Sequence, residues 1–238
     1  MIDEDYQAWD AYPQYRWLFN KLEIALKLGY RAGPACVPLP KVKEIHFKAV
    51  IRPIYNLYGM GIGAKVFTFN PSIDNNFIVN HGCVPPGYFW CEYFEGTHYS
   101  IDYKATNAPK GSMFRWESFH AMVGINTEKD LTRFKRWTSV EPPKMMLPDF
   151  INRIMDVDYL NIECIDDKII EIHLRTGNDV LHDTSLGTEV IPIWSDEKTI
   201  SKELEKQGYK FKPNLYPDSF NYGADGHLKY VREGYMIK

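Results

Sequence analysis

Carboxylates and an imidazole stand at alternate positions in the second half of the chain. Glu171, His173 and Arg175 lie on a strand-like segment, so their side chains share one face of it. Glu163 lies on the preceding strand-like segment, across the turn at 166–167, and can converge on the same face. Such an oxygen-rich set can hold a divalent cation and suits Mg²⁺ or Mn²⁺ better than structural zinc. A solvated sheet face with an incidental Glu/Arg pair is the alternative.

A glycine-rich stretch could bind an anionic oxygen. It lies between the strand-like segments 47–51 and 64–69, which form a predicted hairpin, and Arg52 stands at the end of the first. Backbone N–H groups of alternating glycines can close on an anion without Cβ clashes, and the guanidinium adds a permanent positive charge. The stretch lacks the Gly-Lys-Ser/Thr of a Walker loop and the helix of a Rossmann fingerprint. A flexible hairpin tip is the alternative interpretation of its glycines, Gly59, Gly61 and Gly63.

A third segment, 89–102, could bind a flat base. Its hydrophobic strand leads into the turn Glu95-Gly96, and His98 follows. The strand's backbone could form hydrogen bonds with the base, while the acidic or imidazole groups could contact a ribose. Taken alone, the segment indicates only a hairpin.

A structural interpretation is preferred for two other features. His120 could reach a substrate or a core partner, and the structural interpretation is preferred. The basic and aromatic stretch 133–137 could touch a polyanion, which leaves nucleic acid open as a partner, but the exposed face of an ordinary helix is the preferred interpretation.

These residues must be positioned by interspersed strands and helices. Helical patterns cover 15–28, 127–137, 146–155 and 198–207. Strand-like segments, besides the hairpin at 47–69, cover 88–94, 98–105, 113–125, 158–165, 168–174 and 189–194. No strict βαβ repeat occurs, so we expect an α+β fold with mainly antiparallel sheet.

Composition indicates an ordinary folded protein. The 238 residues are 45% apolar and 25% charged, with a net charge of −3, which excludes a disordered chain and a global basic field. The sequence has no apolar run of the roughly 20 residues that a membrane span needs, and its acidic N-terminus does not resemble a secretory signal. We expect a cytoplasmic protein with reduced, mostly buried cysteines, namely Cys36, Cys83, Cys91 and Cys164.

Taken in order, four segments between about residues 15 and 180 resemble the ATP-grasp superfamily. The family opens with a Lys at a helix, and Lys21 matches it. A strand with Lys-Pro and a Gly-rich lid loop follows, and Ile51-Arg52-Pro53 with its glycines is similar. The family's Glu-rich adenine hinge resembles Cys91-Glu92-Tyr93-Phe94-Glu95-Gly96. Its pair of metal-binding strands resembles Asn161-Ile162-Glu163 and Glu171-Ile172-His173-Leu174-Arg175.

The resemblance implies a role for each matching residue. Lys21 and Arg52 would contact ATP phosphates, and Gly59, Gly61 and Gly63 would close over them. The hinge backbone would hold adenine, with Glu92, Tyr93 and Phe94 around it, and Glu95 or His98 would take the ribose. Glu163 and Glu171 would ligate Mg²⁺, with His173 in place of the family's Asn, and Arg175 would stabilise the transferring phosphoryl group. An imidazole ligates through nitrogen, which leaves Mn²⁺ open as the metal. Arg52 replaces the family's second Lys, and His98 replaces its ribose Glu.

By this resemblance, the expected fold is two α+β lobes clamping a nucleotide. Residues 1–45 would form an N-terminal arm and the helical segment of the nucleotide fold, 46–106 the lid lobe with loop and hinge, 107–180 the metal-binding lobe, and 181–238 a C-terminal extension packed on the second lobe. The substrate-binding domain that usually precedes these elements is not expected in the chain. A second copy, a partner subunit or the extension would then complete the substrate site.

The implied activity is an ATP-dependent carboxylate–amine ligase that uses Mg²⁺. It would convert a small-molecule acid to an acyl phosphate and join it to an amine. The alternative is a non-catalytic nucleotide-binding or adaptor module of the same fold.

Overall fold

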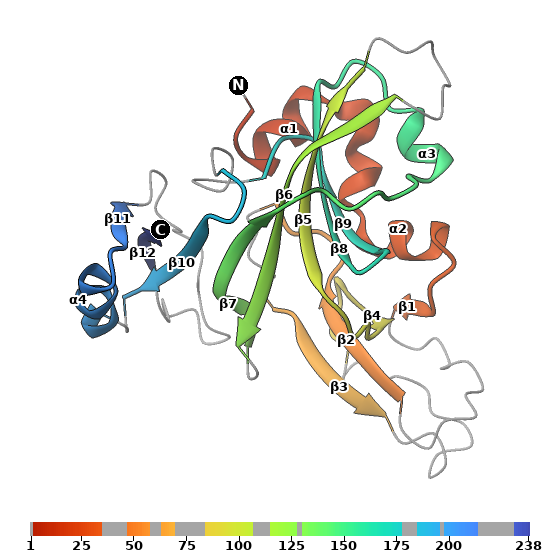
Figure 1. Ribbon diagram of the computed structural model, residues 1–238. Helices are drawn as coiled ribbons and strands as arrows, with labels where there is room; N and C mark the ends of the chain where they lie inside the picture. Colours follow the sequence, from red (N-terminus) through yellow and green to blue (C-terminus); the bar gives the residue numbers. More distant parts are fainter. Residues whose placement is uncertain are drawn as a thin grey trace.

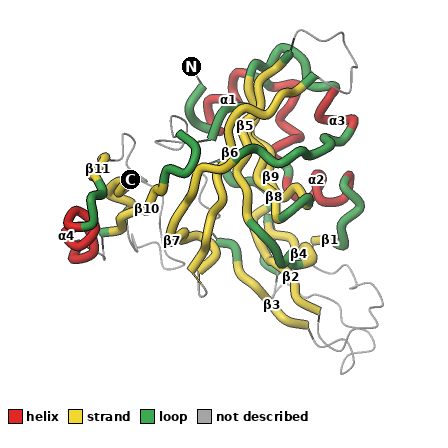
Figure 2. Tube along the Cα trace, in the orientation of Figure 1, coloured by secondary structure: helices red, strands yellow, loops and turns green. Residues whose placement is uncertain are grey.

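Two antiparallel sheets form the centre of the computed structural model (Figure 1). It describes residues 2–34, 47–57, 63–69, 84–106, 115–127, 130–177, 185–195, 198–213 and 231–238. The helices are α1 (Asp5–Ala11), the 3₁₀ helix η1 (Pro13–Phe19), α2 (Lys21–Lys27), α3 (Asp149–Asn152) and α4 (Lys198–Lys206). Figure 2 shows that helices flank the sheets while strands make up the centre of the molecule.

The larger sheet has eight strands in the order β11-β12-β10-β7-β6-β5-β8-β9. In chain order these are β5 (His98–Ala105), β6 (Trp116–Thr127), β7 (Asp130–Val140), β8 (Tyr159–Ile165), β9 (Lys168–His173), β10 (Glu189–Trp194), β11 (Lys210–Pro213) and β12 (Arg232–Ile237). Strand β9 lies at one edge, and the β10–β12 end with α4 extends away from the helices α1 to α3 (Figure 1).

The smaller sheet has four strands in the order β1-β4-β2-β3. They are β1 (Ala32–Pro34), β2 (Phe47–Pro53), β3 (Lys65–Phe69) and β4 (Tyr88–Glu92). The chain passes from β4 of this sheet directly into β5 of the larger one, so the segment 93–97 joins the two sheets.

The core lies on the apolar face of the β5–β8–β9 part of the larger sheet. Side chains alternate along a strand, so Ile101, Ile162 and Ile172 point to one face while their polar neighbours point to the other. The apolar face packs against η1, α2 and α3 through buried residues that include Leu18, Phe19, Ile24, Ile151 and Ile154. This packing leaves the opposite, polar face of the same strands to form a site.

The N-terminal arm, which contains η1 and α2, is held beside edge strand β9. Asn20 has an extended backbone, and its side chain accepts a hydrogen bond from the Glu23 N–H at 3.0 Å, which caps α2. This cap divides the helix predicted at 15–28 into η1 and α2. Both pieces contact β9, so the first residue of α2 lies against the edge of the sheet.

The predicted α+β class with mainly antiparallel sheet is confirmed, because every strand pairing described is antiparallel. Strands at the predicted hairpins 47–69 and 158–174 are present, as is the helix predicted at 198–207. The predicted helix at 146–155 is reduced to α3, which begins after Pro148. The region predicted as a lid lobe, 46–106, includes β5, which belongs to the larger sheet. The region predicted as a C-terminal extension, 181–238, includes β10 to β12, which belong to the same sheet.

The helix predicted at 127–137 is wrong, because residues 130–137 lie in strand β7. Its Trp137 pairs with Gly124 of β6, and the rings of Phe134 and Trp137 lie where a Cβ at residue 124 would be. The absence of a side chain at Gly124 thus lets both rings pack across β6. Pairing with β6 and aromatic packing outweigh the local cap signature that favoured a helix.

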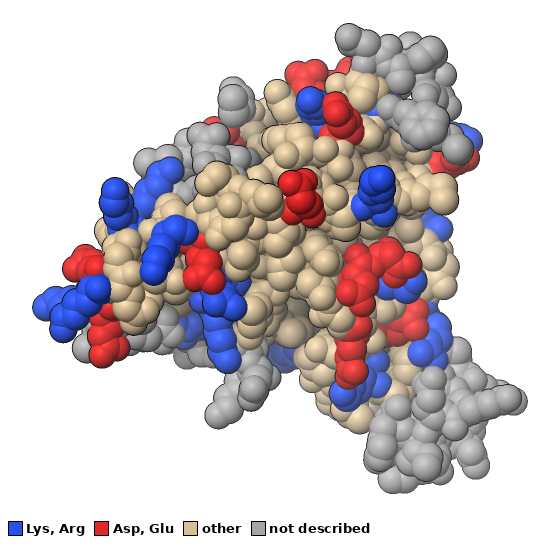
Figure 3. Space-filling view, viewed as in Figure 1, with Lys and Arg blue, Asp and Glu red and all other residues tan. Residues whose placement is uncertain are grey.

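Surface charge is interspersed on the face shown in Figure 3, where basic and acidic side chains alternate over the α4–β11 end and over the small sheet. No helix within the described ranges is long and apolar enough to cross a membrane. Cys91 and Cys164 are free and buried, and burial raises their thiol pKa values to about 11 and about 12. Both therefore remain protonated and unreactive at neutral pH. Cys36 and Cys83 lie outside the described residues.

Candidate functional site

Strand register places polar side chains in two rows across the larger sheet. Glu163 of β8 pairs with Glu171 of β9 on one side and with Ser100 of β5 on the other. One step along the strands, Asn161 of β8 pairs with His173 of β9 and with Asp102 of β5. Directly opposed residues of antiparallel strands share a face, so both rows point away from the apolar core.

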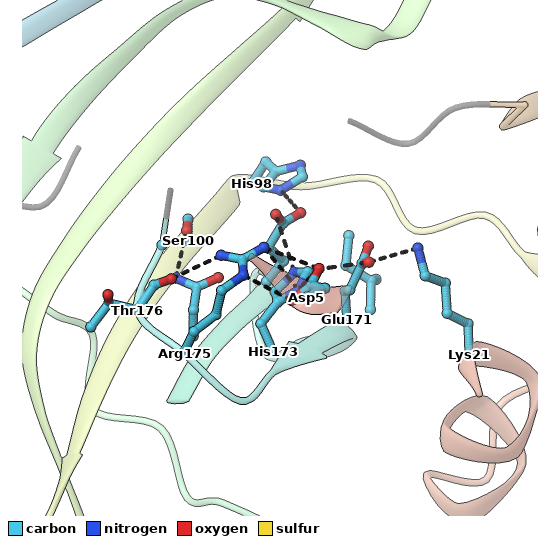
Figure 4. Close-up of polar contacts among 12 residues, drawn as sticks. Asp5, Lys21, His98, Ser100, Glu171, His173, Arg175 and Thr176 are labelled. Carbon is cyan, nitrogen blue, oxygen red and sulfur yellow. Dashed lines mark hydrogen bonds and ion pairs between the residues drawn. The ribbon is translucent and has the colours of Figure 1, made fainter. Parts of the chain in front are cut away.

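The first row holds two carboxylates beside two imidazoles (Figure 4). His98 Nε2 lies 3.1 Å from Glu163 Oε2, and His173 Nε2 lies 3.8 Å from both Glu163 Oε1 and Glu171 Oε1. Burial alone would raise the pKa of Glu163, but His173 and His98 outweigh it and hold that pKa well below its usual range. The carboxylate of Glu163 therefore stays ionised at neutral pH.

A buried ion network adjoins these carboxylates. His173 Nδ1 lies 2.8 Å from Asp5 Oδ2, and Arg175 Nη2 donates to the same oxygen at 3.0 Å. Burial would lower the pKa of His173, but the charge of Asp5 reverses this effect and raises it to about 9. Asp5 itself has a lowered pKa, because Arg175 and His173 overcome the effect of its burial. At neutral pH the network thus holds one negative and two positive groups.

Lys21 and Arg52 reach the same edge of the sheet from other elements. Lys21, the first residue of α2, places Nζ 2.6 Å from Glu171 Oε1. Arg52 of β2 donates from Nη2 to the carbonyl of Ile170, the residue before Glu171, at 3.0 Å. Both cations therefore converge on β9, one from the arm and one from the small sheet (Figure 4 shows the first).

A small cavity lies where these elements meet. It is partly open to solvent and is bounded by the arm, β9 and the segment after β2. Its lining combines a charged pair with apolar side chains and an amide: Leu18, Phe19, Lys21, Ile24, Asn56, Ile170, Glu171 and Ile172.

The second row continues into a hydrogen-bond network around Asp102. Asp102 accepts from Asn161 Nδ2 at 2.8 Å and from the Gly177 N–H at 2.7 Å, and its other oxygen lies 3.2 Å from His120 Nδ1. Asn161 also donates to Ser100 at 2.9 Å. His120 is thus tied to a buried carboxylate, which agrees with its structural interpretation.

The predicted adenine hinge occupies the connection between the two sheets. Glu92 ends β4 and forms an ion pair with Arg31 at 2.8 Å, while Glu95 pairs with Lys48 at 2.8 Å. Tyr93 donates its N–H to the Lys48 carbonyl, and the Phe94 ring packs edge-on against Tyr30. Both carboxylates predicted to contact a nucleoside are therefore paired with cations. One cation lies just before β1 and the other lies in β2.

The structure brings together six of the predicted site residues, namely Lys21, His98, Glu163, Glu171, His173 and Arg175. Gly63 has a positive φ of 81°, and a Cβ there would meet the Tyr88 ring. Gly59 and Gly61 lie outside the described residues. Asp5 was not predicted, because an acidic N-terminal run gives no local sign of which carboxylate turns inward.

Carboxylate oxygens such as those of Glu163 and Glu171 are the ligand type that hard divalent cations prefer. Within the part of the chain that the structure describes, no three His, Cys, Asp or Glu side chains are disposed to hold a metal ion. His173 uses Nδ1 for Asp5, and with a pKa of about 9 its ring is protonated at neutral pH. In that form it offers no lone pair to a metal.

Sequence comparison does not identify relatives: no family model matches the chain, and no curated protein sequence matches it. Structural comparison finds proteins of similar fold. The ADP complex of an N5-carboxyaminoimidazole ribonucleotide synthetase superposes with a TM-score of 0.55 and 12% identity, over 98% of our chain and 72% of that one. The Staphylococcus aureus N5-carboxyaminoimidazole synthetase superposes with a TM-score of 0.52 and 10% identity, over 92% and 66%.

A third similar structure, from Archaeoglobus fulgidus, is described as an ATP-grasp superfamily protein. It has a TM-score of 0.44 and 12% identity, and the alignment covers 76% of our chain. Our chain spans 58% of that protein's length. At these identities the similarity shows the fold alone, which this chain shares with the two synthetases.

Proposed function

We propose that this protein is an ATP-dependent ligase that activates a carboxylate as an acyl phosphate and joins it to an amine. One observation carries the proposal: Glu163 and Glu171 oppose one another on the polar face of adjacent strands, with Lys21 and Arg175 beside them. Paired carboxylates next to two cations are what a nucleotide and its metal ion require. The solved structures of similar fold include ADP complexes, which supports a nucleotide as the ligand.

In this proposal the two sheets enclose the nucleotide. The connection at 91–95 contacts adenine through its backbone, and Gly63 belongs to a loop that covers the phosphates. Arg52 supports this placement, because its Nε is buried without a hydrogen-bond partner among the described residues and is available to an anion. Its Nη2 is already fixed by the Ile170 carbonyl, so the guanidinium is oriented in advance.

Glu163 and Glu171 would hold Mg²⁺ together with nucleotide oxygens and water. The metal ion, when bound, would neutralise charge on the transferring phosphoryl group. Lys21 and Arg52 would bind the phosphates, and Arg175 would stabilise the phosphoryl group and the acyl phosphate formed from it. Because phosphoryl transfer depends mainly on positioning and charge neutralisation, these fixed cations supply most of what the reaction needs. The acid, the amine and any second subunit at the site stay unassigned.

A non-catalytic nucleotide-binding module is the second candidate, and the internal ion pairs favour it. Arg175 is 5% exposed and already bonded to Asp5 and to the Thr176 carbonyl, and Lys21 is bonded to Glu171. A site in which these two cations are neutralised internally could bind a nucleotide weakly and perform no chemistry. The experiment below separates the two candidates.

The test measures ATP affinity by calorimetry with and without Mg²⁺, in the wild type and in Glu163→Ala and Glu171→Ala. We expect both substitutions to abolish Mg²⁺-dependent ATP binding. Glu117→Ala is the matched control, because Glu117 is an exposed carboxylate of β6 that is paired with Lys104. If both site variants kept wild-type affinity, the metal assignment would be wrong.

Phosphate release is then measured with panels of acids and amines. Release that depends on both an acid and an amine supports the ligase. Mg²⁺-dependent ATP binding without phosphate release on any pair favours the non-catalytic module.

A further inference from the structure

Helix α1 sends one carboxylate into the site. Asp5 is 1% exposed, although it is the first residue of a seven-residue surface helix. The helix start is fixed by a capping box between Glu4 and Gln7, and Ala8, one turn after Asp5, is buried in the core. Residues three apart share a helix face, so packing of Ala8 directs Asp5 inward as well.

Asp5 contacts both basic residues of the buried network. Its Oδ2 is 2.8 Å from His173 Nδ1 and 3.0 Å from Arg175 Nη2, and its Oδ1 is 2.8 Å from Arg175 Nε. The opposite side of the guanidinium is also held, because Nη1 donates to the Thr176 carbonyl at 2.8 Å. Arg175 is therefore fixed on two sides and cannot rotate without breaking one of these contacts.

The same carboxylate sets the direction of the His173 ring. With Nδ1 directed at Asp5, Nε2 is directed at the space between Glu163 and Glu171, at 3.8 Å from an oxygen of each. A carboxylate that holds one imidazole nitrogen while the other faces a functional site is a common way of fixing ring orientation. Figure 4 shows the Asp5 carboxylate joined by dashed lines to both His173 and Arg175.

We propose that Asp5 is a positioning residue, which holds the Arg175 guanidinium and the His173 ring in the orientation that the Glu163–Glu171 site needs. It acts through these two side chains and does not touch the ligand. The inference rests on the proposed function, because Arg175 is assigned there to the transferring phosphoryl group. The competing interpretation is that Asp5 fills a place meant for an anionic ligand, and the two interpretations predict opposite changes in affinity.

The test compares ATP and ADP affinities, with Mg²⁺, for the wild type and Asp5→Asn. Loss of a positioning carboxylate typically weakens a site 10–100-fold, so we expect ATP to bind about 10–100-fold more weakly. ADP lacks the terminal phosphoryl group and should change by about twofold or less. Asp10→Asn is the matched control, because Asp10 lies on the same helix and its side chain is 79% exposed. Tighter ATP binding by Asp5→Asn would show that Asp5 occupies an anion site, and equal losses for ATP and ADP would show a merely structural role.

A double-mutant cycle tests whether Asp5 acts through Arg175. Asp5→Asn should add little to the loss of ATP affinity in an Arg175→Lys background, whereas independent roles would give additive losses. Asp5→Glu keeps the charge and is the second variant if Asp5→Asn does not fold. Asp5→Glu should keep more of the ATP-over-ADP preference than Asp5→Asn does. A merely structural role for Asp5 would leave that preference the same in both variants.

One readout does not depend on nucleotide binding. In the wild type the His173 Nδ1 proton should give a downfield, slowly exchanging NMR signal, identified by its loss in His173→Asn. That signal should disappear or shift in Asp5→Asn and persist in Asp10→Asn. If the wild type bound no ATP, the proposed function would fail, while this signal would still test the positioning of His173. An unchanged signal in Asp5→Asn would overturn the inference.

Discussion

Lys21 and Glu171 form a buried ion pair that joins the first residue of α2 to the edge strand of the larger sheet. Their side chains are 6% and 14% exposed, and Nζ and Oε1 lie 2.6 Å apart. The proposed function assigns these two groups to different ligands, the phosphates and the metal ion. Ligand binding would therefore replace an internal ion pair with two new contacts, which keeps each charge neutralised in both states.

Breaking this pair from either side should destabilise the protein. Lys21→Met and Glu171→Gln each leave a buried charged group without its partner, and we expect each to lower the free energy of unfolding by about 3–5 kcal/mol. The double variant removes both charges and should cost much less than the sum of the two losses. Urea denaturation of the four proteins measures this coupling.

The matched control is the exposed pair Lys27–Glu23 on the same helix, with atoms 3.6 Å apart and both side chains about two-fifths exposed. Lys27→Met should cost roughly 0.5 kcal/mol or less. Strictly additive losses for Lys21→Met and Glu171→Gln would contradict the prediction, because they would mean that the pair contributes no coupling energy.

The stability of the metal-free protein should fall as the pH rises above neutrality. The His173 pKa is raised from 6.5 to about 9 in the folded state, mainly because the charge of Asp5 outweighs burial. A raised pKa means that the protonated ring stabilises the fold fully below about pH 6.5, and that this contribution is lost as the pH passes through about 9. The loss should be on the order of 3 kcal/mol.

Urea denaturation between pH 6 and 9.5, with a chelator present, would measure this loss. In His173→Asn the slope over that range should be smaller, because the titrating group is gone. The same slope in both proteins would show that His173 does not cause the pH dependence.

How far the sequence predicts the site depends on how local each signal is. The β8–β9 hairpin is predictable, because alternation of Ile with polar residues fixes both its strands and the shared face of Glu163 and Glu171. Asp5 is not predictable, because its partners His173 and Arg175 lie 168 and 170 positions away along the chain. Strand β7 is mispredicted for a related reason, since pairing with β6 decides its structure against a local helix signal.

Truncation of the sheet core should be costly. Ile162 is fully buried at the centre of β8, between Ile101 of β5 and Ile172 of β9. Ile162→Ala removes buried methylene and methyl groups and leaves a cavity, and we expect it to lower the free energy of unfolding by about 2–5 kcal/mol. Val66→Ala on the exposed edge strand β3 is the control and should change it by about 0.5 kcal/mol. Thermal denaturation of both variants checks this, and similar losses would place Ile162 outside the core.

Replacement of Arg52 by Lys should separate its charge from its geometry. The Arg52 guanidinium connects the two sheets through the Ile170 carbonyl and lies 5.4 Å from the Phe89 ring centre, with Nε left for a ligand. Lysine keeps the positive charge but loses the planar fork, so one ammonium group cannot hold the carbonyl and an anion in the same arrangement. We expect Arg52→Lys to weaken ATP binding about tenfold, a loss typical of one charge-assisted hydrogen bond.

Arg136→Lys, which alters a half-exposed ion pair with Glu189, should leave ATP affinity unchanged. Calorimetry with Mg²⁺ and ATP measures both variants. Wild-type affinity in Arg52→Lys would mean that a point charge suffices and that the fork does not contact the nucleotide.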